Sequence, residues 1–162
     1  MIHIIGFNIT WFGLVYWGNA FIPLAFVFLL LHFLFYYQNY NQLILIIVIS
    51  SIGILTDSLL QYFDVFIFSG VSHIPFWLIM LWVCFSATLP HVLGLLGKSK
   101  LLSIILGLLA PFSYIAGYQL NAVGFGYSLL VVYCLLSIIW VLQFTLFLKL
   151  QTDFIAEGER DV

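Results

Sequence analysis

The sequence predicts an all-α fold, a polytopic transmembrane bundle of six helices with the N- and C-termini in the cytoplasm. Hydrophobic residues make up 65% of the 162 residues and charged residues only 6%, whereas a typical soluble domain carries about 25% charged residues. The apolar runs are close to the roughly 20 residues that a spanning helix needs. They are also continuous, whereas strands of a membrane barrel alternate apolar and polar residues.

We expect the helices at about residues 2–18, 21–37, 43–63, 74–96, 101–120 and 125–150, in one transmembrane domain of residues 1–150. The first is short and carries Asn8 and Thr10, so whether it fully spans is left open. Pro23 suits the first turn of the second helix, and the polar segment 38–42 ends that helix. The third helix ends before Asp64.

The fourth helix follows Ser72, a candidate N-cap, and has Pro75 in its first turn. Lys98 and Lys100 form a basic turn before the fifth helix, and segment 121–124 leads to the sixth. Residues 151–162 form a short acidic tail on the cytoplasmic side.

Prolines and small residues indicate bends and close packing in the fourth and fifth helices. Pro90 and Pro111 each remove a helical hydrogen bond and bend their helices. The fifth helix carries two pairs of small residues at four-residue spacing, which permits close helix approach. They are Ser103, Gly107, Ser113 and Gly117.

The basic residues set the expected orientation, because Lys and Arg collect on the cytoplasmic side of a membrane. With six spans, all four fall on one side: Lys98, Lys100, Lys149 and Arg160. We therefore expect a multi-pass protein of the bacterial inner (plasma) membrane. Four basic residues cannot form a phosphate-binding surface, which excludes nucleic acid as a partner. Cys84 and Cys134 are expected to be small buried hydrophobes.

Asp57 is the residue around which the other helices are interpreted. It lies well inside the apolar run that begins at Leu43, and an Asp at a helix centre in a bilayer costs about 2.5–3.5 kcal/mol. Such a residue is a functional hypothesis by default. The alternative is a structural carboxyl that fixes the third helix by bonding to Gln61 and a tyrosine.

Depth along the bundle argues against a direct contact between Asp57 and His91. A rise of 1.5 Å per residue separates them by roughly 13 Å along the membrane normal. Two polar layers are expected instead. The outer layer contains Asp57, Gln61, Trp82, Cys84, Tyr114 and Tyr118, and the inner one His91, His32, Asn8, Ser51 and Gln143.

The candidate site residues follow from these layers. Asp57 is the candidate acid/base or polar anchor, and His91 a second catalytic candidate at the cytoplasmic end. The expected substrate-binding residues are Gln61, Trp82, Thr88 and Tyr114. No metal-ligand spacing, phosphate loop or nucleophile elbow is present, so no metal and no cofactor is predicted.

Four segments carry a resemblance to a known family. They are 55–60 (LTDSLL), 74–77 (IPFW) with 81–82 (LW), 85–91 (FSATLPH) and 111–117 (PFSYIAG). In these segments the chain resembles an uncharacterised family of small proteobacterial inner-membrane proteins, classed as a domain of unknown function. The resemblance implies an inner-membrane bundle of helices and no activity, substrate or cofactor.

Three functions are compatible with this pattern, so whether the chain is an enzyme is left open. The leading hypothesis is a small membrane-embedded enzyme or enzyme subunit acting on a lipid-soluble substrate, with membrane lipid around it. The first alternative is a transporter or proton-coupled carrier that uses both polar layers as stations. The second is a non-catalytic assembly partner that contacts another membrane protein, or a second copy of the chain, through the small residues of the fifth helix.

Overall fold

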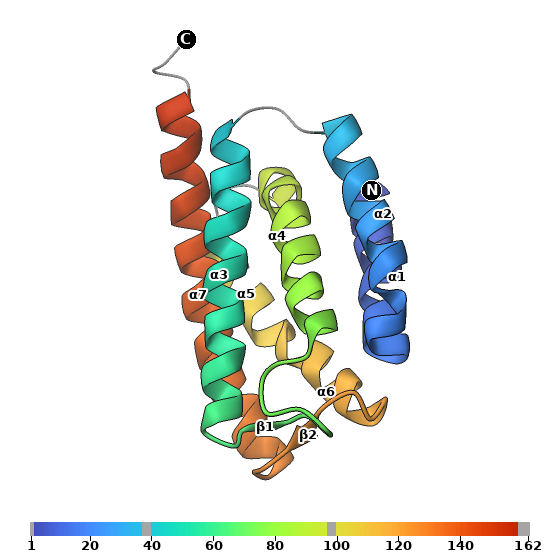
Figure 1. The fold of residues 1–162 in the computed structure, drawn as a ribbon. Helices are drawn as coiled ribbons and strands as arrows, with labels where there is room; N and C mark the ends of the chain where they lie inside the picture. Colours follow the sequence, from blue (N-terminus) through green and yellow to red (C-terminus); the bar gives the residue numbers. More distant parts are fainter. Residues whose placement is uncertain (1, 37–39, 97–99, 159–162) are drawn as a thin grey trace.

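The computed structural model describes residues 2–36, 40–96 and 100–158, and its described part is almost entirely helical. Seven α-helices, one short 3-10 helix and two short strands make up this part (Figure 1). In chain order they are α1 (Ile2–Trp17), η1 (Gly18–Phe21), α2 (Ile22–Tyr36), α3 (Tyr40–Tyr62), β1 (Phe66–Ile67), α4 (Phe76–Leu96), α5 (Lys100–Leu109), α6 (Pro111–Gln119), β2 (Gly124–Phe125) and α7 (Leu129–Gly158).

Five helical stretches are long and apolar enough to cross a membrane, which indicates a membrane protein. They are Ile4–Tyr36, Tyr40–Tyr62, Phe76–Leu93, Leu101–Gln119 and Leu129–Asp153. The expected count of six spanning helices differs from this result. The first stretch contains α1 and α2, whose 16 and 15 residues give lengths of about 24 and 22 Å. Each is shorter than a hydrocarbon core of about 30 Å.

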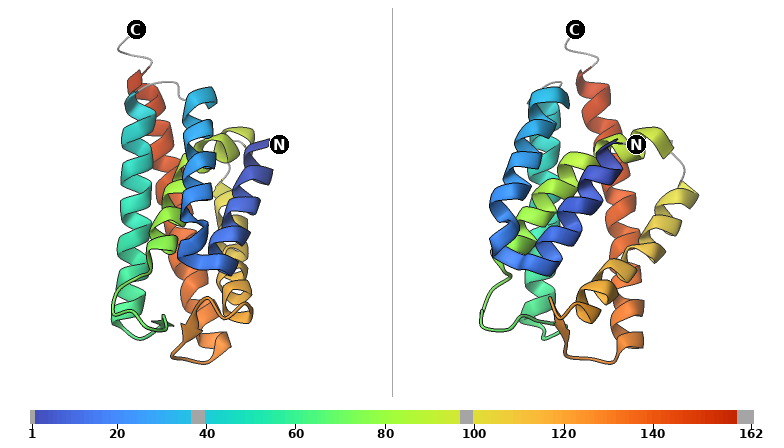
Figure 2. Two further views of the ribbon diagram at one scale, coloured as in Figure 1. Left: turned by 45° about the vertical axis from the view of Figure 1, so that its right-hand side comes forward. Right: turned by 90° about the vertical axis from the view of Figure 1, so that its right-hand side faces the viewer.

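α1 and α2 form a hairpin that packs against α4 (Figure 2). The chain reverses at η1, where Gly18 has a φ of 58°, a conformation that glycine adopts without a steric penalty. The side-chain oxygen of Asn19 accepts a hydrogen bond of 3.0 Å from the backbone N–H of Trp77. This bond fixes the hairpin turn to the beginning of α4.

The expected fifth helix is divided into α5 and α6 at Ala110. Pro111 has no N–H to donate to the preceding turn, and the N–H of Ser113 bonds to the carbonyl of Ala110, so the predicted bend becomes a boundary between two helices. α5 packs along α7, and a Cβ at Gly107 would lie 2.6 Å from the Val141 backbone. The Gly107 side of α5 is therefore occupied by α7 within the molecule.

Two loops are joined by a pairing that the sequence did not predict. β1 and β2 pair antiparallel, with Phe66 opposite Phe125 and Ile67 opposite Gly124. Asp64 precedes β1 with a φ of 56°. Its N–H bonds to the carbonyl of Gln61, and the next N–H, of Val65, bonds to that of Leu60. These bonds end α3 and hold the chain in position to enter β1.

α7 extends beyond the expected helix end at residue 150 and continues to Gly158. Gln151, expected in the tail, is buried and donates a hydrogen bond of 2.9 Å to the carbonyl of Pro90 on α4. Lys149 is exposed on the same helix. Lys98 and Arg160, on which the expected orientation also depends, lie outside the described residues.

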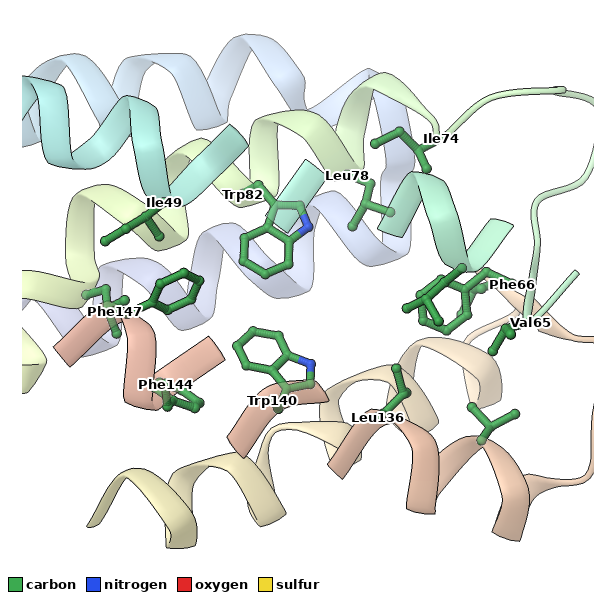
Figure 3. Close-up of a cluster of buried hydrophobic side chains, with 14 of the residues drawn as sticks. Ile49, Val65, Phe66, Ile74, Leu78, Trp82, Leu136, Trp140, Phe144 and Phe147 are labelled. Carbon is green, nitrogen blue, oxygen red and sulfur yellow. The ribbon is translucent and has the colours of Figure 1, made fainter. Parts of the chain in front are cut away.

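The core lies between α3, α4 and α7 and is rich in aromatic rings (Figure 3). The rings of Trp82 and Trp140 stack nearly parallel, with centroids 5.4 Å apart and planes inclined by 12°. Phe85 meets both indoles edge-on. Because stacked and edge-to-face pairs are the favourable arrangements of aromatic rings, this cluster fixes how α4 and α7 face each other.

Candidate functional site

Asp57 lies on the face of α3 that points into the bundle and is only 1% exposed. Its Oδ2 accepts a hydrogen bond of 2.6 Å from the indole N–H of Trp82 on α4. The hydroxyl of Tyr114 on α6 donates to Oδ1 at 3.1 Å and lies 3.4 Å from Oδ2. One carboxyl group therefore joins three helices, and its two donors offset part of the cost of burying it.

Trp82 can reach Asp57 because position 53 has no side chain. Gly53 lies one helical turn before Asp57 on α3, and a Cβ there would overlap the Trp82 ring. The indole thus packs directly against the α3 backbone. Residues four apart share a helix face, so the N–H on the edge of this ring is aligned with the carboxylate.

Tyr114 is held by aromatic contacts from other elements. Its ring stacks on Phe66 of β1 with centroids 5.1 Å apart, and the ring of Trp140 lies 6.2 Å away. The β1–β2 pairing therefore has a role in the site, because it places Phe66 behind the tyrosine. The hydroxyl of Tyr114 is left directed at Asp57.

A cavity of about 330 Å³ lies beside this cluster, between α1 and the α5–α6 pair. In the right-hand view of Figure 2 the α5–α6 pair lies to the right of α1. We call it the aromatic cavity. Its walls include Phe7 and Trp11 from α1, Trp77, Trp82 and Phe85 from α4, Ser113, Tyr114 and Gly117 from α6, and Trp140 and Phe144 from α7. Asp57 lies behind the wall, bonded to Trp82 and Tyr114.

His91 belongs to a second cluster, which it shares with α2. Its ring lies 5.2 Å from that of His32 and 6.0 Å from that of Tyr36, measured between centroids. His32 and Tyr36 line a second cavity of about 400 Å³ between α1, α2 and α4, which we call the histidine cavity. Cys84 and Thr88 also line it, and Phe7 lines both cavities.

Several expected members of the polar layers lie elsewhere. Cys84, expected near Asp57, faces the histidine cavity. Gln143, expected near the histidines, donates a hydrogen bond of 2.8 Å to the Thr56 hydroxyl beside Asp57. Asn8 and Ser51 are exposed, and the Asn8 amide bonds to the Ile4 carbonyl on its own helix. Depth along the bundle was the basis of these assignments, and depth does not determine which way a side chain points around its helix.

The expected substrate-binding residues divide between the two cavities. Trp82 and Tyr114 line the aromatic cavity, and Thr88 lines the histidine cavity with its hydroxyl donated to the Cys84 carbonyl. Gln61 is half-buried and lines neither of these two cavities. The two catalytic candidates are also apart: Asp57 bonds to Trp82 and Tyr114, and His91 lies beside His32 and Tyr36.

Sequence reasoning missed Trp140, which lines the aromatic cavity from α7 and stacks on Trp82. The sequence did contain a clue, because this Trp lies in the middle of the last apolar run. Trp residues of membrane helices are enriched at the two membrane–water interfaces, so a Trp at mid-depth indicates another role. Within the described ranges, no group of three or more His, Cys, Asp or Glu side chains is arranged to hold a metal ion.

A family model described as "Protein of unknown function (DUF2878)" matches residues 1–146 of the chain. The matched segment contains every residue of the Asp57 cluster and of both cavities. The searches of curated proteins and of solved structures found no match.

Proposed function

We propose that this chain, which belongs to the DUF2878 family of proteins of unknown function, is a multi-pass protein of the bacterial inner membrane that binds a lipid-soluble molecule in the aromatic cavity. We propose further that it acts on this molecule as a small membrane enzyme or as a subunit of one. One observation carries the proposal. Both side chains that donate hydrogen bonds to the buried Asp57 also form the wall of a cavity large enough for a ligand.

The proposed roles follow from which atoms reach the cavity. Tyr114 lines it and would contact the bound molecule, whereas Asp57 lies behind and would orient the tyrosine hydroxyl. Buried ionisable groups in membrane segments commonly mark such sites. His91 would act separately at the cytoplasmic end, beside the histidine cavity.

The test is to identify what the purified protein carries. Wild type and Gly117→Leu would be purified from membranes, extracted with organic solvent and compared by mass spectrometry. A Cβ at Gly117 would lie 3.6 Å from Val123, which is ordinary contact, so the larger leucine would extend into the cavity that Gly117 lines. We expect one lipid-soluble molecule to be enriched in wild type and lost from the variant. Identical extracts would contradict the proposal.

An enzyme, as distinct from a binding protein, changes that molecule. The enriched compound would be incubated with wild type and with Asp57→Asn in lipid nanodiscs and followed by mass. We expect a product that forms with wild type and forms at least tenfold more slowly with the variant. Equal rates would remove Asp57 from the proposed mechanism.

The second candidate function is transport, and the shared wall of the two cavities favours it. Phe7 lines both the aromatic cavity and the histidine cavity, and we propose that its movement joins the two into a path between the Asp57 and histidine clusters. If this path is used, replacing Phe7 with Ala would accelerate the uptake of the bound lipid-soluble molecule into proteoliposomes. An unchanged rate would argue against it.

The proposed orientation, with both termini cytoplasmic, is tested by labelling single cysteines. The loop before α4 and the C-terminal end of α7 lie at opposite ends of the bundle (Figure 1). In a background with Cys84→Ala and Cys134→Ala, Ser72→Cys in that loop and Asp153→Cys near that helix end each place one probe. We expect a membrane-impermeant maleimide added to intact spheroplasts to label position 72 only. Labelling of position 153 alone would reverse the orientation, and labelling of both would contradict a bundle that spans the membrane.

A further inference from the structure

The chemistry of the aromatic cavity restricts the class of ligand, an inference that rests on the proposed function. Eighteen of the described residues line it, of which nine are aromatic and none is charged. An anion bound there would lose its hydration without gaining a partner of opposite charge, which is a large energetic cost. The cavity therefore disfavours an anionic ligand.

The two hydroxyl groups of the α6 wall have already used their protons. Ser113 donates to the carbonyl of Ala110 at 2.7 Å, and Tyr114 donates to Asp57 at 3.1 Å. A hydroxyl has one proton to donate and two lone pairs that accept. Toward the cavity, these two groups therefore offer acceptors.

The other polar side-chain groups among the described residues of the wall are indole N–H groups, which can only donate. Trp82 uses its N–H on Asp57, while Trp11 and Trp77 also line the cavity. A ligand hydroxyl can donate to the α6 wall and accept from an indole, but a carbonyl can only accept. We propose that the ligand is an uncharged lipid alcohol whose hydroxyl donates to the oxygen of Tyr114 or Ser113.

Farnesol, farnesal and farnesoic acid test this inference because they share one carbon chain and differ only in the terminal group. The volume of about 330 Å³ lies at the small end of the range for ligand pockets, which suits a single chain of this size. Affinities would be measured with wild-type protein in phosphatidylcholine nanodiscs, by competition against radiolabelled farnesol. We expect the alcohol to bind at least tenfold more tightly than the aldehyde and the ionised acid.

Matched variants identify the acceptor. Tyr114→Phe and Ser113→Ala each remove one hydroxyl, and we expect at least one of them to reduce the affinity for the alcohol to that for the aldehyde. Tyr118→Phe is the control, because Tyr118 lies one turn later on α6, is exposed and stacks on Phe125 outside the cavity. It should leave both affinities within twofold of wild type. Melting temperatures would show that each variant is folded.

The outcomes separate this inference from the proposed function. Equal affinity for alcohol and aldehyde, with both abolished by Gly117→Leu, would overturn the alcohol inference and leave the ligand site standing. Alcohol-selective binding that both hydroxyl variants leave intact would also overturn it. Binding that is undetectable in wild type, or is unchanged in Gly117→Leu, would overturn the inference and the proposed site together.

Discussion

The indole of Trp82 occupies the space in which Gly53 would carry a side chain, and this close approach aligns its N–H with Asp57 one turn away. Gly53→Ala should therefore displace the ring and weaken the hydrogen bond. Overpacking of a buried site costs about 1–3 kcal/mol. We expect that loss in the free energy of unfolding, measured by SDS denaturation in mixed micelles. Gly6→Ala is the control, because a Cβ there meets nothing within 4 Å, and a similar loss in both variants would refute this account.

The coupling between Asp57 and Trp82 is measurable by a double-mutant cycle. Trp82→Phe removes one of the two donors to the buried carboxyl, and leaving a buried polar group unsatisfied costs about 1–3 kcal/mol. Replacing the carboxyl as well removes this penalty. We expect Asp57→Leu combined with Trp82→Phe to be less destabilised than the sum of the single variants, by about 0.5–3 kcal/mol. Strict additivity would show that the bond contributes nothing.

Close packing of α5 on α7 should depend on the absence of a side chain at position 107. A Cβ there would lie 2.6 Å from the Val141 backbone, and backbone cannot move aside as a flexible side chain can. Gly107→Ala should destabilise the protein by about 1–3 kcal/mol. The same SDS titration would measure it. A neutral result would place α5 further from α7 than the structure has it.

Gln151 joins the last turns of α7 to α4. Its amide donates to the Pro90 carbonyl at 2.9 Å, and a bond of this kind contributes about 0.5–1.5 kcal/mol. We expect Gln151→Leu to reduce the free energy of unfolding by that amount. Thr152→Val is the control, because the Thr152 hydroxyl bonds to the Lys149 carbonyl on its own helix. A larger effect at 152 would contradict the interhelical contact.

The helical class and the approximate positions of α3 and α4 could be predicted because long apolar runs are a strong local signal. The division at Pro111 was visible only as a bend, since local sequence does not show whether α5 and α6 separate. The pairing of Phe66 with Phe125 could not be predicted, because two-residue strands have no periodicity and join segments far apart in the chain.

The site was predictable in part. Asp57 was identifiable from the cost of its charge, and Tyr114 and Trp82 from their depth. The structure joins all three by hydrogen bonds. The placement of Gln143 beside Thr56 depends on how α7 is rotated against α3. That rotation is set by packing of the whole core, in which Trp140 takes part, and no single segment encodes it.

The central claim is that Asp57 is held by Trp82 and Tyr114 at the wall of a cavity that binds a lipid-soluble molecule. An experimental structure of the protein in lipid nanodiscs tests it most directly. We predict non-protein density in the aromatic cavity within hydrogen-bonding distance of Tyr114 or Ser113, with Asp57 still bonded to Trp82. A cavity filled by collapsed side chains, or an Asp57 carboxylate facing bulk water or acyl chains, would contradict the account.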